Sequence, residues 1–160
     1  MHLSKIFISP AFKGQMTPAD VLNTTCTFMF VTDVAAVQRG GVIFFVSDTD
    51  FSFSFALHDG TICLERNGTS VEISLAQLVD PQQKLIVTAT WTASHLQVEC
   101  HTTGFRREQS ACTPPTAPPP RLIEWARRAN LIETQVFDSE EQFRQKVHSC
   151  LQSISAKIHS

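Results

Sequence analysis

A chain of 160 residues, 42% of them hydrophobic and 18% charged, can form one folded domain with an appendage. This composition excludes a disordered chain, and the formal net charge of −2 argues against a nucleic-acid-binding surface. No stretch approaches the roughly 18 to 20 continuous apolar residues that a membrane helix needs. The N-terminal residues lack a secretory signal pattern, so a cytoplasmic protein that does not bind membranes is expected.

The first hundred residues consist mainly of short β-branched and aromatic runs separated by turn residues. In residues 23–32, one face carries cysteine and phenylalanine while the opposite face carries threonine and Met29. An apolar run at 42–46 follows, and the segment 51–57 then alternates strictly between large apolar residues and serine or alanine. A period of two over seven residues predicts half-buried strands.

Two hairpins are predicted next, because Asp59-Gly60 and Asn67-Gly68 are sequences typical of tight turns between antiparallel strands. They connect the segment 51–57 to predicted strands at 61–66 and 70–74. Two further strands are predicted at 84–91 and 95–102, where Leu96, Val98 and Cys100 share one face. Short strands at this spacing indicate a mainly β protein, an antiparallel β-sandwich or barrel.

Residues 113–120 read Thr-Pro-Pro-Thr-Ala-Pro-Pro-Pro, which predicts a semi-rigid linker. The hydrophobic period then becomes helical in 121–131. Ser139 and Gln142 form a capping box that starts a second predicted helix. The sequence therefore predicts a β-sandwich domain at 1–112, a linker at 113–120 and a pair of C-terminal α-helices in a tail at 121–160.

Three pieces of the β region resemble the concanavalin A-like jelly-roll family, in particular its laminin-G-like branch. They are the strand pair 41–47 and 51–57, the Asp-Gly hairpin at 57–64, and the Trp-ending strand 85–91 that turns into Leu96-Gln97-Val98. The resemblance covers roughly residues 5–105. It implies two antiparallel sheets with ligands bound at loops or on a concave face, but no single function, because lectins, glucanases and protein-binding modules share this fold.

No catalytic or metal-binding pattern emerges from the sequence. The Glu-x-Asp-x-x-Glu motif of glucanases is absent, and the Asp48-Thr49-Asp50 segment is explained better as a turn than as a calcium site. Glu99 and His101 share a strand face, which is expected to be an exposed polar face. Five widely spaced cysteines lack zinc spacing and are expected to be free thiols. We therefore expect no enzymatic activity, no metal and no cofactor.

The function expected is a non-catalytic recognition module that acts as a protein-interaction subunit of a larger assembly. Its sandwich would recognise a partner, while its helical tail would dock on a protein or on a second copy. The alternative is a lectin-like carbohydrate-binding domain, and a glycoside hydrolase of the same fold is the weakest rival. Candidate ligand-binding residues lie in the loops: Asp48, Asp50, His58, Asp59 and Asn67. Candidate partner-binding residues lie in the tail: Trp125, Arg127, Arg128, Phe143, Val147 and Leu151.

Overall fold

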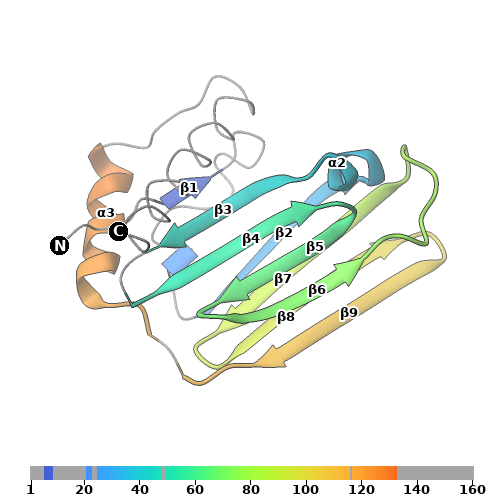
Figure 1. Ribbon diagram of the computed structural model, residues 1–160. Coiled ribbons are helices and arrows are strands. Elements are labelled where there is room, and N and C mark those ends of the chain that lie inside the picture. Colours follow the sequence, from blue (N-terminus) through green and yellow to red (C-terminus); the bar gives the residue numbers. More distant parts are fainter. Residues whose placement is uncertain (1–5, 9–20, 23–24, 48–49, 116, 133–160) are drawn as a thin grey trace, which may run out of the picture.

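The computed structural model describes residues 6–8, 21–22, 25–47, 50–115 and 117–132. Within them the chain forms two antiparallel sheets stacked as two layers (Figure 1). The predicted second C-terminal helix lies outside the described residues, as do Asp48, Phe143, Val147 and Leu151.

The five-stranded sheet has the order β1-β3-β4-β5-β6. Its strands are β1 (Ile6–Ile8), β3 (Gly41–Ser47), β4 (Ser52–His58), β5 (Thr61–Arg66) and β6 (Thr69–Ser74). The four-stranded sheet has the order β2-β7-β8-β9, with β2 (Cys26–Asp33), β7 (Lys84–Thr92), β8 (His95–Thr102) and β9 (Phe105–Cys112). Every neighbouring pair is antiparallel. The prediction of a mainly β, sandwich-like architecture is confirmed.

The apolar residues that alternate along the predicted strands are the residues buried between the two sheets. The inward residues of β4 are Phe53, Phe55 and Leu57, and those of β8 are Leu96, Val98 and Cys100; all are buried. Trp91 is fully buried, with its ring centroid 5.0 Å from that of Phe53 on the facing sheet. One continuous apolar core therefore holds the two layers together.

Both predicted hairpin turns are present. Asp59 and Asn67 adopt left-handed backbone conformations, with φ of 48° and 50°, and each is followed by a glycine that also has positive φ. Aspartate and asparagine tolerate this region better than other non-glycine residues. The turns fix the register of β4, β5 and β6.

A short helix, α2 (Val34–Arg39), directly follows β2 at one end of the sandwich. The Asp33 carboxylate caps it by accepting a hydrogen bond of 2.8 Å from the Ala36 N–H. It ends at Gly40, where φ is 76° and an added Cβ would lie 2.9 Å from the Leu57 carbonyl oxygen. The N–H of Gly60 donates to the Val37 carbonyl, so the β4–β5 turn lies at this end too.

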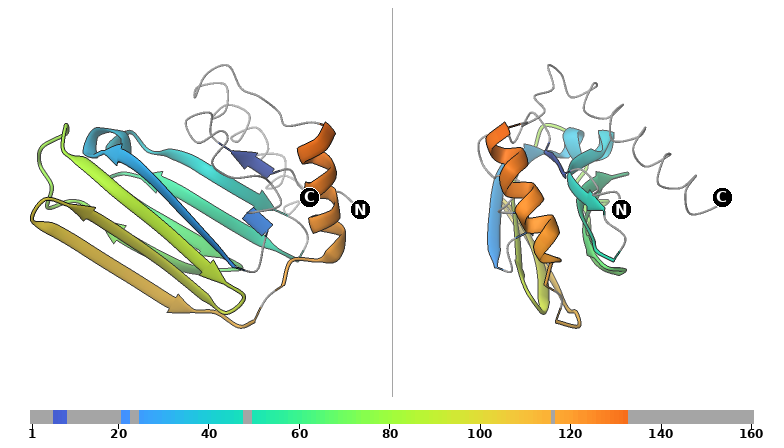
Figure 2. Two further views of the ribbon diagram at one scale, coloured as in Figure 1. Left: turned by 180° about the vertical axis from the view of Figure 1, so that it is seen from behind. Right: turned by 90° about the vertical axis from the view of Figure 1, so that its left-hand side faces the viewer.

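The helix α3 (Pro120–Ile132) crosses the opposite end of the sandwich, as the right-hand view of Figure 2 shows. Leu122 and Ala126 are fully buried and belong to the same core cluster as the strand residues. The predicted helix at 121–131 is therefore confirmed, and these two side chains pack against the sandwich. The division of the chain at 113–120 stays a prediction.

Candidate functional site

The outer face of the four-stranded sheet carries the residues of each strand that point away from the core. Because directly paired residues share a face, the register places them in rows across β2, β7, β8 and β9. One row is Val31, Ile86, His101 and Arg106. The next row is Met29, Thr88, Glu99 and Glu108. Apolar and charged side chains thus occupy opposite halves of one surface.

The apolar half consists of Met29, Val31 and Ile86, which we call the apolar patch. Their side chains are large, yet the residues are 62%, 66% and 45% exposed. Val31 pairs directly with Ile86, and Met29 lies two residues along the same face of β2. Three adjacent exposed apolar side chains contribute little to the core, so packing between the two sheets does not explain them.

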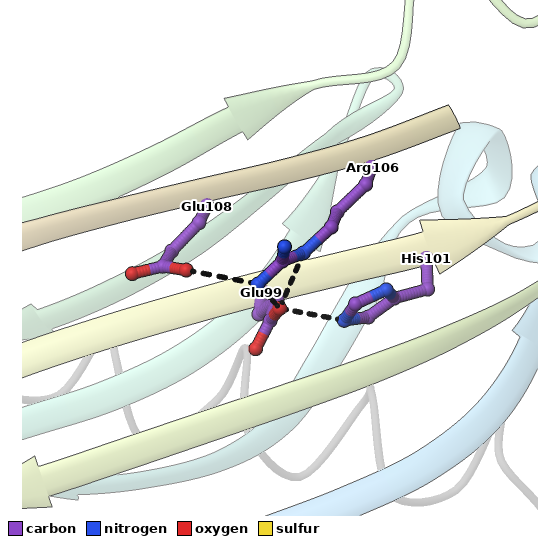
Figure 3. Close-up of polar contacts among 4 residues, drawn as sticks. All are labelled: Glu99, His101, Arg106 and Glu108. Carbon is purple, nitrogen blue, oxygen red and sulfur yellow. Dashed lines mark hydrogen bonds and ion pairs between the residues drawn. The ribbon is translucent and has the colours of Figure 1, made fainter. Parts of the chain in front are cut away.

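The charged half is a network centred on Glu99 (Figure 3). Its Oε1 atom accepts a 2.9 Å hydrogen bond from Nε of Arg106. The same oxygen forms ion pairs with Nη2 of Arg106 at 2.8 Å and with Nε2 of His101 at 2.7 Å. Arg106 also reaches Glu108, with 3.5 Å between Nη2 and Oε2. The Arg106 hydrogen bond is the main reason that the pKa of Glu99 lies below its usual range, and the charge of His101 adds to it.

This network is acidic overall when His101 is neutral, because two carboxylates share one guanidinium. Glu99 is mostly enclosed by its partners, whereas the Glu108 side chain is 45% exposed and its contact with Arg106 is long. Glu108 therefore offers a carboxylate to an approaching cation. Nearby, Lys84 and Asp33 pair at 3.8 Å and add no net charge.

The predicted ligand-binding residues lie at two ends of the five-stranded sheet. Asn67 and Asp50 are at the end where β4 begins, and the Oδ1 of Asn67 accepts a 2.8 Å hydrogen bond from the Ser52 N–H. His58 and Asp59 are at the other end, 3.1 Å apart and 83% exposed. The structure does not bring the two groups together, and Asn67 has a structural role in joining neighbouring turns.

The predicted partner-binding residues that are described all belong to α3. Arg127 is exposed, while for Trp125 and Arg128 the structure describes the helical backbone alone. Among the described residues, no group of three or more His, Cys, Asp or Glu side chains could hold a metal ion.

Sequence reasoning identified part of the surface. It placed Met29 on the strand face opposite Phe28 and Phe30, and it placed Glu99 and His101 together on an exposed face. It missed Ile86, because Leu85-Ile86-Val87 is continuously apolar and does not show which residue points outward. The Arg106-Arg107 pair stood out only as a possible contact point, and Arg106 was not placed beside Glu99 because β9 was not predicted. The sequence of β9 is mostly polar, as suits an edge strand.

Comparison with known proteins adds no family: no family model, curated protein or solved structure matches this chain. Within the described residues, no helix is both long and apolar enough to span a membrane.

Proposed function

We propose that this chain is a non-catalytic recognition module that binds a partner protein through the outer face of the four-stranded sheet. One observation carries the proposal: an exposed apolar patch lies beside an acidic network on the same rigid sheet. The stacked antiparallel sheets support a concanavalin A-like, laminin-G-like jelly-roll assignment, in which such modules use a sheet face or loops to bind.

The chemistry of the face defines the partner. Covering the exposed parts of Met29, Val31 and Ile86 would contribute about 1 kcal/mol each, which is roughly a hundredfold in affinity for the three together. The excess carboxylate at Glu108 favours a Lys or Arg beside the apolar contacts. The occupant is therefore a protein segment with apolar side chains flanked by a basic residue. The helical tail, with Arg127 exposed on α3 at the opposite end of the sandwich, would dock separately from this patch.

A randomised peptide library tests this proposal without knowledge of the natural partner. Peptides are selected on the full chain and then measured on two matched variants, Ile86→Lys and Ser70→Lys. Both variants add the same residue, but Ser70 lies exposed on the outer face of the other sheet, opposite Glu65. Circular dichroism establishes that both variants are folded before binding is compared.

The expected peptides combine apolar residues with Lys or Arg, and their affinity falls at least tenfold with Ile86→Lys but not with Ser70→Lys. Peptides that bind all three proteins equally would contradict the proposed surface. A glycan array is the parallel arm: glycan binding that survives Ile86→Lys, with no peptide selected, would favour the lectin-like function at the loops instead.

A further inference from the structure

Arg66 is a charged residue at a core position. It is the last residue of β5, whose inward face carries Ile62, Leu64 and then Arg66. The whole residue is 3% exposed. Because the opposite end of β5 adjoins α2 through the Gly60–Val37 hydrogen bond, Arg66 lies at the end crossed by α3.

The guanidinium has polar and aromatic contacts but no acid. Its Nη2 donates a 2.9 Å hydrogen bond to Oγ1 of Thr113, and its central carbon lies 5.8 Å from the Phe53 ring centroid. The Nε–H is buried and has no hydrogen-bond partner among the described residues. No carboxylate of the described residues pairs with Arg66, so within this part of the chain the guanidinium has no anionic partner.

A second donor at the same end lacks an acceptor. Trp91 is fully buried, and no residue in the described part of the chain accepts a hydrogen bond from its Nε1–H. Both Trp91 and Arg66 contact the ring of Phe53, one from each sheet. Thr113 adds a third group, because a hydroxyl that accepts a hydrogen bond from Arg66 keeps its own proton to donate.

Such an arrangement is costly unless something supplies acceptor atoms. A buried cation without an anion and a buried N–H without an acceptor each destabilise a fold, the charge much more than the dipole. Burial already lowers the pKa of Arg66. The end of the sandwich beneath α3 therefore has more hydrogen-bond donors than acceptors among the described residues, and one of the donors, Arg66, is a cation.

We propose that this end of the sandwich binds a small oxyanion, a carboxylate or a phosphate, through the Arg66 Nε–H and the Thr113 hydroxyl. Arginine suits this role because its planar N–H groups match the paired oxygens of such ligands. The Trp91 N–H lies at the same end of the sandwich, on the facing sheet, and is not required for this binding. The bound anion would also brace Thr113, the residue at which the chain leaves β9 for α3.

The test compares the full wild-type chain with Arg66→Met and with the control Arg39→Met. Both variants remove one guanidinium, but Arg39 is exposed in the last turn of α2. Thermal unfolding is followed in sodium acetate and in sodium phosphate, each against sodium chloride of equal ionic strength. The Nε–H resonance of Arg66 is followed in the same solutions by nuclear magnetic resonance.

At an anion concentration tenfold above Kd, the folded-to-unfolded ratio of wild type and of Arg39→Met should rise about elevenfold, and that of Arg66→Met should not. The Arg66 Nε–H resonance should shift with the same concentration dependence. Stabilisation by acetate alone would indicate a planar carboxylate ligand, and stabilisation by phosphate alone would indicate a tetrahedral one.

Equal stabilisation of Arg66→Met, or an Arg66 resonance unmoved by both anions, would overturn the proposal. If Arg66→Met does not fold, Arg66→Lys replaces it in the unfolding experiment, and the Arg66 resonance of the wild-type chain is judged by the same criterion.

Discussion

The two sheets of this molecule present opposite chemistry to solvent although their strands alternate in the same way. The outer face of the five-stranded sheet carries small side chains and two carboxylates: Ser54, Ala56, Cys63, Ser70, Glu65 and Glu72. Phe45 shares that face but is only 5% exposed. The outer face of the four-stranded sheet instead exposes Met29, Val31 and Ile86 beside the Glu99 network.

The fold constrains the residues at inward strand positions but not those at outward positions. Inward positions on both sheets need apolar residues, because they form the single core. Outward positions are not constrained by the core, so large apolar residues there have to be explained by something outside it. This is why the four-stranded sheet, and not its partner, is the better candidate for recognition.

Cys63 and Cys112 lie on the outer faces of the two sheets, and the difference between their alkylation rates should be the largest effect of all. Burial, helped by the nearby carboxylates of Glu72 and Glu65, raises the pKa of Cys63 to about 11. At pH 8 its thiolate is then roughly a hundredfold scarcer than that of an ordinary thiol, and alkylation slows in proportion. Cys112, exposed on the outer face of the four-stranded sheet, should react first.

Iodoacetamide labelling of the native chain, followed by peptide mass spectrometry, measures both rates at once. Glu72→Gln should accelerate the labelling of Cys63 and leave that of Cys112 unchanged. Equal native rates for the two thiols would mean that the outer face of the five-stranded sheet is more open than the structure has it.

The Glu99 network should contribute a smaller, pH-dependent stability. Arg106→Gln removes the hydrogen bond and the ion pair to Glu99 and should cost about 0.5 to 1 kcal/mol at pH 7. Because the pKa of Glu99 is lower in the folded protein than in the unfolded chain, its stabilising effect is complete above about pH 5 and is lost as the pH falls through the folded value. The difference between wild type and variant should therefore shrink in acid.

Urea unfolding at pH 7 and at pH 3 measures that difference. Arg39→Gln is the control, since Arg39 is exposed and no ion pair of the described residues involves it. A cost for Arg106→Gln that stays constant with pH would show that Glu99 is not the partner responsible.

The smallest effect is expected at the apolar patch itself. Ile86→Thr should change the free energy of unfolding by no more than about 0.5 kcal/mol, because the side chain is half exposed and threonine suits a strand. Val87→Thr, one residue further on the inward face, should cost about 1 to 3 kcal/mol by burying a hydroxyl. Similar costs for the two changes, measured by urea unfolding, would mean that Ile86 belongs to the core.

Much of the fold could be predicted, because the side chains of 51–57 and 95–102 alternate strictly and two hairpin turns carry Asp-Gly and Asn-Gly. The helix α2 was missed because its six residues are too few to show a helical period. The strand β9 was missed because an edge strand needs no apolar face.

The candidate sites were harder to predict. Rows across a sheet depend on register, and no pattern within one strand places Ile86 beside Val31 or Arg106 beside Glu99. Arg66 has the phase of a core residue but a charged side chain, and local sequence does not indicate whether it is buried. These features arise from pairing between distant segments.

The most direct test of the central claim is to map where a library-selected peptide binds on the isotopically labelled chain. Amide chemical shifts are measured as the peptide is added. We expect perturbations centred on Met29, Val31, Ile86 and His101. Perturbations centred on Ser54, Cys63 and Ser70, or on the turns at 58–59 and 67–68, would contradict it and move the recognition surface elsewhere.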